Sequence, residues 1–430
     1  MGPFFDALET RSPLERERAL MTALSRQVAH AKAHTHAFAE LLADVDPSAV
    51  TNRGALASLP VIRKHDNFLQ RQSAGQKHGD PFGGFAAVGS SGLGTVSRVR
   101  RIFQSPGPIY EPEGHGGDFE RVSRAMYAAG FRPGDLVHNT FSYHLTPAGA
   151  MMEAAAVALG CAVIPGGVGN SELQLRAIED LRPSCYVGTP RFLRTLLEKA
   201  SEKTGDRLTI CKALVSGEAF GAAARAWLHE NGVDAYQCYA TADLGLIAYE
   251  TEAREGLVVD ENLIIEIVRP GTGDPLPDGE VGELVVTSLN PDYPLIRFAT
   301  GDLSAILPGQ CPTGRTNVRI RGWMGRADQT AKVRGMFVHP SQVAEVMRRH
   351  PEITRARLVI SDGSNDVDWQ SDGMLLQAEV HDSAEGLDQA IAASVRNVTK
   401  LRCEVELLAA GALPNDGKLI DDQRQLAAQT

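Results

Sequence analysis

Short apolar segments alternate with helical segments between about residues 85 and 300, and this alternation limits the possible folds more than any other feature of the chain. The expected strands are Leu136–Asn139, Ala162–Ile164, Cys185–Val187 and Ala213–Val215. The expected helices are Ala148–Leu159, Glu172–Leu181 and Pro190–Ala200. Glycine or proline stands at most junctions. The pattern predicts an α/β sheet with helices on both faces.

The segments outside this region have other patterns. Apolar residues at helical spacing over Leu14–Leu42 predict one or two amphipathic helices. Leu263–Val268 and Gly282–Thr287 are expected to form antiparallel strands of a smaller β subdomain. Beyond Asp328 we expect an α+β unit, with helices Pro340–His350 and Ser383–Val398 and strands Ala356–Ile360, Gly373–Val380 and Glu404–Leu408. At ~100 residues, such a unit is large enough to be a domain.

The bulk composition limits the partners and the compartment. With 430 residues the chain exceeds what one hydrophobic core usually supports, so two or more domains are expected. A net charge of −10 argues against a nucleic-acid-binding surface, which is usually basic. No apolar run approaches the ~20 residues that cross a membrane, and the dispersed cysteines form no C-x-x-C pair. We expect a cytoplasmic protein that binds neither nucleic acid nor membrane.

A segment rich in glycine and serine, Val88–Thr95, is a candidate phosphate-binding loop. Backbone N–H groups and hydroxyls of such a loop can surround phosphate oxygens, and glycine permits a close approach. The residues concerned are Ser90, Ser91, Gly92, Gly94 and Thr95. Nearby cations could come from Arg98, Arg100 and Arg101. An ordinary glycine turn is the alternative interpretation.

Two further blocks follow in order. An apolar segment ends in Thr300-Gly301-Asp302, where a carboxylate at a strand end can accept two hydrogen bonds from vicinal hydroxyls. Gly325-Arg326-Ala327-Asp328 and Lys332-Val333-Arg334-Gly335 come next. A pair of surface ion pairs would be the alternative. Together the blocks resemble R-T-G-D-L and G-R-x-D-x-x-x-K-x-R-G of the adenylate-forming (acyl-CoA synthetase) superfamily.

The resemblance runs from roughly Leu59 to Gln425 and is closest to the phenylacetate–CoA ligase branch. L-P-V-I-R-K, H-N-T-F-S-Y, V-I-P-G-G, G-E-L-V-V-T and C-P-T-G-R-T also support this branch. The candidate phosphate loop is similar to S-S-G-T-T-G, but it has Leu93-Gly94-Thr95 in place of T-T-G and lacks the following proline and lysine. The resemblance implies a large N-terminal α/β domain with mixed sheets and a β subdomain over residues 1–326. A small mobile α+β domain would cover residues 327–430.

The resemblance also implies which residues contact ATP and Mg²⁺. Besides the loop, the nucleotide contacts would be Gly217, Glu218, Ala219, Tyr239, Ala240, Thr241, Asp302 and Arg326. Asp302 and Arg326 would hold the ribose, and Tyr239 would stack on the adenine. Asp243 would hold Mg²⁺ on the triphosphate, with a side chain one methylene shorter than the glutamate of the family. A helix N-cap is the alternative role for Asp243.

The other implied residues concern the acid, coenzyme A and the hinge. Phe141, Tyr143 and His144 follow an expected strand and would line the acid, or would form an aromatic turn that packs on the next helix. Asp328 would be the hinge, and coenzyme A would enter along a segment that includes Lys332, Arg334 and Gly335. Lys418, in an L-P-x-x-x-G-K-like block, would stabilise negative charge during adenylation.

The implied reaction has two steps. A carboxylic acid, with an aryl or arylacetic acid as the default, attacks the α-phosphorus of Mg·ATP and forms an acyl-adenylate. The thiol of coenzyme A then displaces AMP. ATP, Mg²⁺ and coenzyme A would be the cofactors, and a homodimer is compatible with the resemblance. The alternatives are an adenylating ligase of the deazaflavin-coenzyme synthetase type and a non-catalytic nucleotide- or acyl-binding protein, which the altered phosphate loop would favour.

Overall fold

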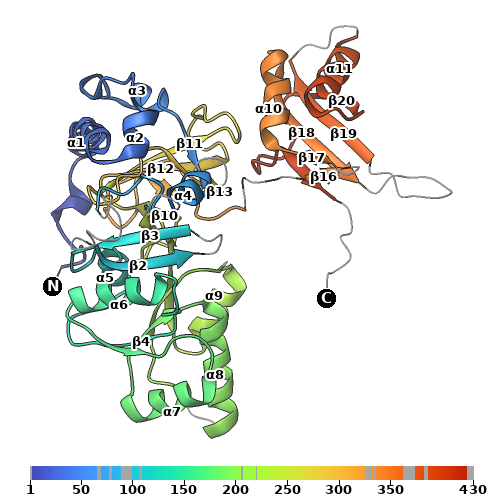
Figure 1. Cartoon of the computed structure of the whole chain (residues 1–430). Helices are drawn as coiled ribbons and strands as arrows, with labels where there is room; N and C mark the ends of the chain where they lie inside the picture. Colours follow the sequence, from blue (N-terminus) through green and yellow to red (C-terminus); the bar gives the residue numbers. More distant parts are fainter. Residues whose placement is uncertain are drawn as a thin grey trace. The chain divides into compact units, whose positions relative to one another are not determined.

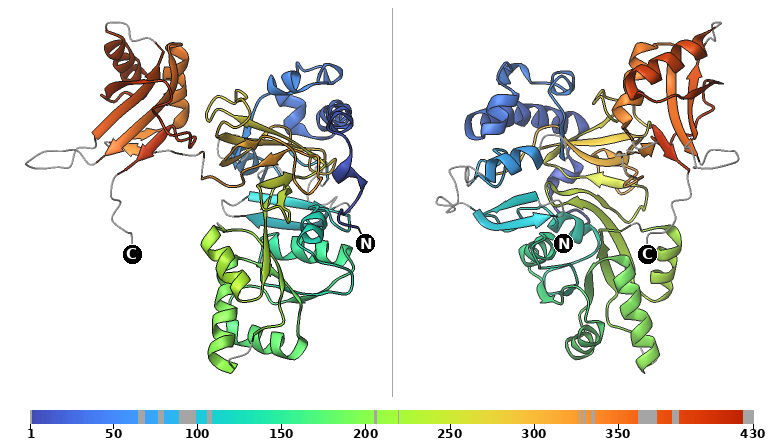
Figure 2. Two further views of the ribbon diagram at one scale, coloured as in Figure 1. Left: turned by 180° about the vertical axis from the view of Figure 1, so that it is seen from behind. Right: turned by 45° about the vertical axis from the view of Figure 1, so that its right-hand side comes forward.

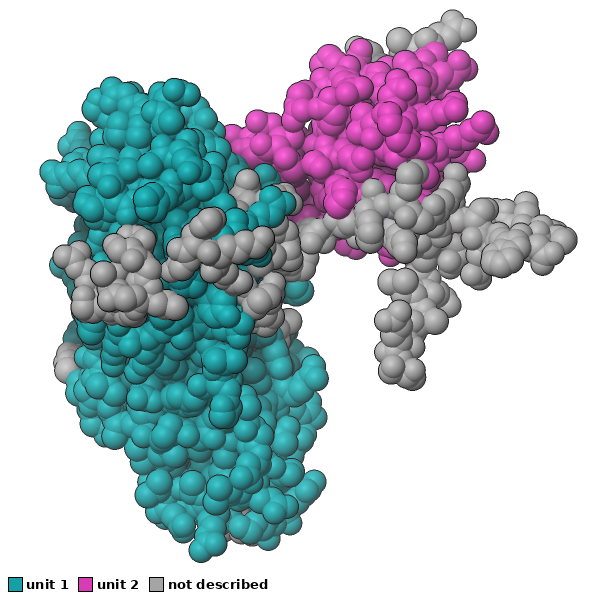
Figure 3. Space-filling view, viewed as in Figure 1, with its two compact units in different colours: residues 1–265, 286–300, 306–323 teal, residues 266–285, 301–305, 324–430 magenta. Residues whose placement is uncertain are grey.

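The computed structural model describes most of the chain. The described residues are 2–64, 69–76, 80–88, 99–105, 109–204, 207–218, 220–325, 327, 329, 331–333, 336–361, 373–381 and 386–423. They separate into two units (Figure 3). Unit 1 consists of Met1–Ile265, Val286–Thr300 and Ile306–Trp323, and unit 2 of Glu266–Val285, Gly301–Ala305 and Met324–Thr430. The predicted domain boundary between residues 326 and 327 stays a prediction.

Among the described residues, the largest sheet has nine strands in the order β14-β15-β10-β9-β8-β7-β6-β4-β5. Its parallel strands are β4 (Leu136–Asn139), β5 (Ala162–Pro165), β6 (Cys185–Gly188), β7 (Lys212–Val215) and β8 (Asp234–Thr241). Antiparallel strands continue it, namely β9 (Gly245–Glu250), β10 (Leu257–Val259), β15 (Arg319–Ile320) and β14 (Ile306–Leu307). The four strands expected from the sequence are therefore confirmed.

Helices cover both faces of the parallel part, as predicted. The helices are α5 (Ser123–Ala128), α6 (Ala148–Ala158), α7 (Ser171–Leu181), α8 (Pro190–Thr204) and α9 (Ala222–Glu230). Leu214 of β7 packs in one core with α5 and α6, whereas its neighbours Ala213 and Val215 pack in a second core with α7, α8 and α9. Because successive side chains of a strand point to opposite faces, the two cores lie on the two faces of the sheet. Figures 1 and 2 show α5 and α6 on one side and α8 and α9 on the other.

The N-terminal region is helical, which confirms the prediction for Leu14–Leu42. It contains α1 (Pro13–His34), α2 (His36–Leu41), α3 (Arg53–Ala57), α4 (Leu69–Gln76) and the 3₁₀ turns η1 (Ala7–Thr10) and η2 (Pro47–Ala49). The hydroxyl of Ser12 accepts a hydrogen bond from the backbone of Glu15, and the Glu15 carboxylate bonds back to Ser12. This capping box explains why α1 begins at Pro13.

A second sheet has four strands in the order β1-β13-β12-β11. They are β1 (Ile62–Arg63), β11 (Leu263–Val268), β12 (Gly282–Ser288) and β13 (Phe298–Ser304). β1 runs parallel to β13, with Ile62 opposite Phe298. The sequence predicted that the apolar strand before the second motif ends at Asp302, whereas β13 continues to Ser304. Backbone bonds between Leu303 and the segment Met324–Gly325 extend the strand beyond the predicted end.

A separate hairpin joins β2 (Val99–Ser105) to β3 (Ile109–Gly114), which run antiparallel with Phe103 opposite Glu111. The sequence did not predict β3. Its segment Ile109–Gly114 contains two glutamates and a proline, which are uncommon in strands.

The C-terminal part of unit 2 is an α+β structure, as predicted. Its four-stranded sheet has the order β20-β19-β18-β21, formed by β18 (Ile353–Ser361), β19 (Gly373–Val380), β20 (Glu404–Ala409) and β21 (Ile420–Asp422). α10 (Pro340–Arg349) and α11 (Leu387–Thr399) pack on it in one apolar core. A small hairpin consists of β16 (Ala331–Val333) and β17 (Met336–Val338). The expected start of α11 at Ser383 lies outside the described residues.

Candidate active site

The carboxyl ends of β4, β6, β7 and β8 meet at one edge of the large sheet, because these strands are parallel neighbours. Ligands of open α/β sheets bind at this edge. The predicted acid-binding residues follow β4, Gly217 and Glu218 follow β7, and Tyr239–Thr241 ends β8. The fold therefore brings three predicted groups of site residues to the same edge.

Phe141 and Gly217 lie close together at this edge. A Cβ atom added to Gly217 would lie 3.8 Å from Cε1 of Phe141 and 3.9 Å from Cγ2 of Thr189. Gly217 has a φ of +82°, a conformation that favours glycine. The loop that was predicted to frame the adenine thus approaches a ring that was predicted to line the acid.

A buried hydroxyl pair holds the start of the Phe141 loop. The Thr140 hydroxyl donates to the Tyr186 hydroxyl at 2.8 Å, and the Tyr186 hydroxyl donates to the backbone oxygen of Thr189 at 3.1 Å. Gly188 leaves room for this pair, since a Cβ atom there would lie 1.9 Å from Oγ1 of Thr140. The hydroxyls of Thr140 and Tyr186 therefore connect the ends of β4 and β6, and the missing side chain of Gly188 makes this contact possible.

Tyr143 packs on the helix that follows it, while His144 is exposed. The amide nitrogen of Asn139 donates to the Tyr143 hydroxyl at 2.8 Å. A Cβ atom on Gly149 of α6 would lie 2.9 Å from Cδ2 of Tyr143. Burial, assisted by the nearby Glu153, raises the pKa of the Tyr143 phenol. The packing is that of the alternative aromatic turn, and substrate contacts by Tyr143 and His144 stay predictions.

Asp243 lies in the turn between β8 and β9 and forms an ion pair with Lys64. The distance from Lys64 Nζ to Asp243 Oδ2 is 2.8 Å, and the Asp243 side chain is 3% exposed. Lys64 directly follows β1, so the pairing of β1 with β13 fixes its backbone. The alternative N-cap role is wrong, because strand β9 begins at Gly245 where a helix would be required. The partner of Asp243 was not predicted from the sequence.

Glu111 of β3 is a further buried carboxyl group. Its Oε1 accepts a hydrogen bond from the Ser105 hydroxyl at 2.5 Å. Burial, together with the negative charge of Asp243, raises the pKa of Glu111 to about 8, although Ser105 and Lys64 act in the opposite direction. Sequence reasoning missed Glu111. The only available signal was a glutamate within an apolar stretch, Ile109–Pro112, which alone does not indicate function.

Two of the arginines that were suggested as cations for the phosphate loop are bound to Glu113. Nη1 of Arg100 lies 3.3 Å from Oε1, and Nη1 of Arg101 lies 3.1 Å from Oε2. The loop residues Ser90–Thr95 and also Arg98 lie outside the described residues.

Asp302 is buried within β13, with 8% of the residue exposed. Gly301 before it has a φ of +72°, and its backbone oxygen accepts a hydrogen bond from the Ala327 N–H at 2.8 Å. The strand of Asp302 is thereby joined to the predicted hinge segment. Among the predicted residues, Ala219, Arg326, Asp328, Arg334, Gly335 and the side chain of Lys332 lie outside the described part of the chain.

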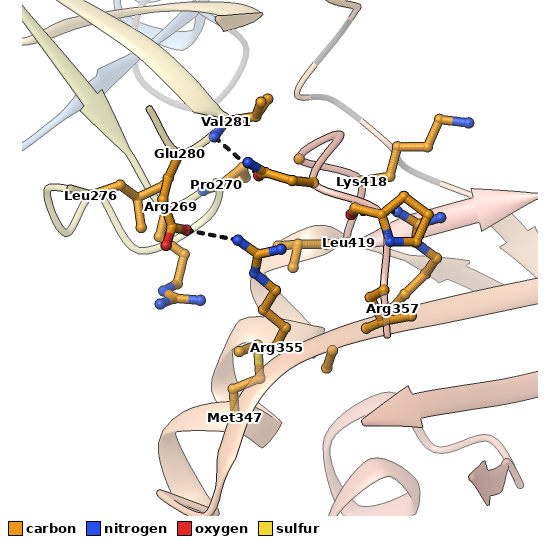
Figure 4. Close-up of a pocket in the computed structure, with 15 residues that line it drawn as sticks. Arg269, Pro270, Leu276, Glu280, Val281, Met347, Arg355, Arg357, Lys418 and Leu419 are labelled. Carbon is orange, nitrogen blue, oxygen red and sulfur yellow. Dashed lines mark hydrogen bonds and ion pairs between the residues drawn. The ribbon is translucent and has the colours of Figure 1, made fainter. Parts of the chain in front are cut away.

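Lys418 lies in unit 2, where its Nζ contacts Asp421 Oδ1 at 2.9 Å. Burial acts to raise the pKa of Asp421, but hydrogen bonds from Gln423 and Lys418, together with the positive charges of Lys418 and Arg357, lower it. Lys418 also borders a small cavity of unit 2, which Figure 4 shows together with the ion pair between Arg355 and Glu280. The Lys418 side chain is 49% exposed, so its ammonium group can leave Asp421 and contact a different negatively charged group.

Comparisons with known proteins agree with this arrangement. The family model "AMP-binding enzyme" matches residues 120–290. A phenylacetate-coenzyme A ligase from Thermus thermophilus is 32% identical over 79% of this chain and 77% of that protein. One from Aromatoleum evansii is 29% identical over 79% and 76%. A solved 2-hydroxyisobutyryl-CoA ligase with 2-HIB-AMP and CoA has a TM-score of 0.70, with 23% identity, and covers 96% of this chain and 92% of that chain.

The helices of the described residues include none with the length and apolar character that a membrane crossing requires. The likeness to the 2-hydroxyisobutyryl-CoA ligase supports the same mixed α/β fold. The identity to the Thermus protein extends over most of both chains. This chain therefore belongs to the phenylacetate–coenzyme A ligase family of AMP-binding, adenylate-forming enzymes.

Proposed function

We propose that the enzyme activates an aryl or arylacetic acid with ATP and transfers the acyl group to coenzyme A. The observation that best supports this proposal is the approach of Phe141 to Gly217. It brings the loop proposed for the acid to the loop proposed for the nucleotide, as attack of a carboxylate on the α-phosphorus requires. The relatives named phenylacetate-coenzyme A ligase support the choice of acid.

In the first step, side chains and loops of the chain would hold the two reactants. Gly217, Glu218 and Tyr239 would frame and stack on the adenine, with Asp302 of β13 on the ribose. The site fits Mg²⁺, because Asp243 Oδ1 is buried and accepts no hydrogen bond from the described residues. When bound, Mg²⁺ would neutralise triphosphate charge. Lys64, held by Asp243, is a second cation for the same region.

Lys418 completes the first step in this proposal. Its ammonium group would leave Asp421 and stabilise the negative charge that develops between the carboxylate and the α-phosphate. For the second step, the domain of residues 327–430 would turn about Asp328. The segment with Lys332, Arg334 and Gly335 would then admit coenzyme A, and the thiol would displace AMP.

The pocket for the acid would be of modest size. Phe141 is largely buried, and the half-buried Ala240 carries a methyl group where the family pattern has glycine. A planar ring contacts Phe141 over a large area, which favours an aryl group over a short aliphatic chain. A homodimer and a cytoplasmic location stay predictions.

A panel of acids tests the proposal. Pyrophosphate release from Mg·ATP should depend on the acid and should be highest with an aryl or arylacetic acid. Thioester should appear only when coenzyme A is added. Preference for short aliphatic acids would contradict the proposed substrate class, and release with no acid dependence would contradict the ligase itself. AMP retained in the product would favour the deazaflavin-coenzyme type of ligase.

A further inference from the structure

Asn139, the last residue of β4, uses its whole side-chain amide to hold the acid loop, which consists of residues 140–147 between β4 and α6. Its Oδ1 accepts a hydrogen bond from the Phe141 backbone N–H at 3.1 Å. Its Nδ2 donates to the Tyr143 hydroxyl and to the backbone oxygen of Gly149 on α6, both at 2.8 Å. A backbone N–H can only donate and a carbonyl oxygen can only accept, so these partners fix the orientation of the amide.

The backbone of Asn139 holds a second segment, the glycine loop of residues 166–169 after β5. The Gly167 N–H donates to the backbone oxygen of Asn139 at 3.0 Å. Gly167 has a φ of +66°, and a Cβ atom added to it would lie 4.0 Å from Cδ2 of Tyr143. The Tyr143 ring thus approaches the glycine loop as well as Gly149 of α6. Asn139 is therefore the residue at which β4, the acid loop, α6 and the glycine loop are joined.

Gln174 of α7 fixes the far side of the glycine loop. Its Nε2 donates to the backbone oxygens of Gly167 and Gly169 at 2.9 and 2.7 Å. Its Oε1 lies 2.7 Å from Nε2 of His138, the neighbour of Asn139 on β4. Because the Gln174 nitrogen must face the two carbonyl groups, Oε1 is the acceptor and His138 Nε2 carries the hydrogen. Two successive residues of β4 therefore hold the two loops.

The position of Asn139 is unusual for a residue that serves stability alone. Asn139 is 0% exposed, and a buried amide contributes little to stability beyond what an apolar side chain of similar size would contribute. A fully bonded polar group does restrict its partners to one arrangement. Two of the three partners of this amide belong to Phe141 and Tyr143. The arrangement that it fixes is therefore the shape of the acid loop.

We propose that Asn139 is a positioning residue for the acid, which holds Phe141 and Tyr143 in the arrangement that accepts a planar ring. This inference rests on the proposed function in the assignment of the acid to Phe141. The acid contacts Phe141 and not Asn139, which lies beneath the loop without exposed surface. A binding site discriminates between ligands only when its contact groups are held within about 0.5 Å of their places. Asn139 thereby sets the preference for an aryl acid over a short aliphatic acid.

Binding of phenylacetate to Asn139→Asp tests this proposal without catalysis. The carboxylate keeps the acceptor for the Phe141 N–H, but it cannot donate to the Gly149 oxygen and repels it. Isothermal titration calorimetry measures phenylacetate binding to the full chain saturated with a non-hydrolysable α,β-methylene analogue of ATP. The Kd for phenylacetate should rise about tenfold or more, because the ring contact is displaced. The Kd for the ATP analogue alone should change less than about twofold, because the three hydrogen bonds all go to the acid loop and α6.

Asn317→Asp is the matched control. Asn317 is 7% exposed, donates to the Val259 oxygen at 2.8 Å and accepts from the Val318 N–H at 2.9 Å, so the same substitution removes the same kind of bond elsewhere in the large sheet. Thermal unfolding should show a lower Tm for both variants, but phenylacetate binding to Asn317→Asp should stay within about twofold of the wild type. Unchanged phenylacetate binding in Asn139→Asp, or equal weakening in both variants, would overturn the proposal.

Tyr143→Phe supplies a second test, because it removes only the hydroxyl that Asn139 binds. Alone it should weaken phenylacetate binding at least about threefold, as expected for one hydrogen bond. Combined with Asn139→Asp it should cause no further loss, since the bond is already broken. Losses that add in the double variant would overturn the proposal. If Asn139→Asp does not fold, Tyr143→Phe takes its place, with Tyr127→Phe, which loses a hydroxyl bond to the Gly2 oxygen, as the control.

Steady-state kinetics separate this role from the proposed function. In Asn139→Asp the KM for the aryl acid should rise while the KM for ATP stays unchanged. If the wild type forms thioester but Asn139→Asp binds phenylacetate normally, the ligase stands and the positioning role is wrong. If Asn139→Asp loses phenylacetate binding while the wild type releases no pyrophosphate with any acid, the positioning role stands and the ligase is wrong.

Discussion

Several acidic side chains of unit 1 are buried. Glu111, Glu120 and Asp243 are all largely removed from solvent. Burial of a carboxylate without a full set of partners disfavours its charged form. Glu120 lies near the turn of Asp243, since a Cβ atom on Gly245 would lie 2.5 Å from Oε2 of Glu120. Shifted pKa values are common at functional sites.

Glu120 should make stability depend on pH. Burial raises its pKa from 4.5 to about 8, and Arg121 opposes this only in part. Between these two pH values the folded state keeps a proton that the unfolded state loses, so stability falls as the pH rises. Glu120→Gln removes this loss. Its stability relative to the wild type should grow from pH 4.5 to 8, by on the order of a few kcal/mol.

Urea unfolding at a series of pH values measures this difference. Glu202→Gln, on the exposed surface of α8, is the control and should change stability little at any pH. A Glu120→Gln difference that stays constant from pH 4.5 to 8 would show that folding does not raise the pKa of Glu120.

Asp243→Asn should separate the two half-reactions. The substitution keeps the size of the side chain but removes the charge that is proposed to hold Mg²⁺ and that binds Lys64. Pyrophosphate release should fall about a hundredfold or more, in line with the loss of other preorganised electrostatic contacts. Attack of coenzyme A on supplied acyl-adenylate involves no triphosphate and should change little. Equal loss in both assays would mean that Asp243 shapes the site and does not serve the triphosphate.

Hydrogen bonds to the neighbouring strand stabilise the loops that follow the parallel strands. Thr140 of the first loop is bound to Tyr186 of β6, and the Ser216 hydroxyl after β7 donates to the backbone oxygen of Cys238 on β8 at 2.8 Å. Each loop is thus fixed by the neighbouring strand, which suits a site built on a rigid sheet.

Gly188→Ala should disturb this arrangement. The new methyl group would overlap with Oγ1 of Thr140, so the pair with Tyr186 must break or the strands must move. We expect a loss of about 1–3 kcal/mol in the free energy of unfolding, and a higher KM for the acid. Chemical denaturation and steady-state kinetics measure the two effects. Gly117→Ala is the control because nothing lies within 4 Å of its added Cβ atom; equal effects of both substitutions would contradict the steric explanation.

The sequence predicted the elements well where local pattern decides them. The bounds of β4, β11 and β19 agree with the expected segments, because apolar runs between turn residues are read directly. The sequence did not predict contacts between segments that lie far apart in the chain. β3 carries Glu111 against strand propensity, and its pairing with β2 stabilises it. β13 extends past Asp302 because Gly325 supplies a backbone partner from further along the chain.

The candidate site was predictable to a similar degree. Motif residues such as Gly217, Tyr239 and Asp243 do meet at one sheet edge, since parallel strands bring their carboxyl ends together. The ion pair of Lys64 with Asp243 joins residues 179 positions apart, so no spacing rule indicates it. Glu111 is absent from the motif pattern for the same reason.

The residues proposed for the reaction belong to both units. Unit 1 carries the acid loop, the adenine loop and Asp243, whereas unit 2 carries Asp302 and Lys418. A lysine that is needed only for adenylation can be exchanged for coenzyme A when a domain turns.

Lys418→Ala should therefore affect adenylation alone. Pyrophosphate release should fall at least about a hundredfold, because the cation beside the α-phosphate is lost. Thioester formation from supplied acyl-adenylate should remain within about threefold of the wild type. Lys203→Ala, which removes another exposed lysine with an ion-pair distance of 2.9 Å, is the control and should leave both steps unchanged. Equal losses in both steps would contradict the proposed domain movement.

The most direct measurement is a product analysis of the full reaction with ATP, coenzyme A and the best acid of the panel. The proposed ligase predicts AMP and acyl-CoA in equal amounts, with pyrophosphate and without ADP. ADP and phosphate as products, or AMP that stays bound to the acyl product after coenzyme A is added, would contradict it.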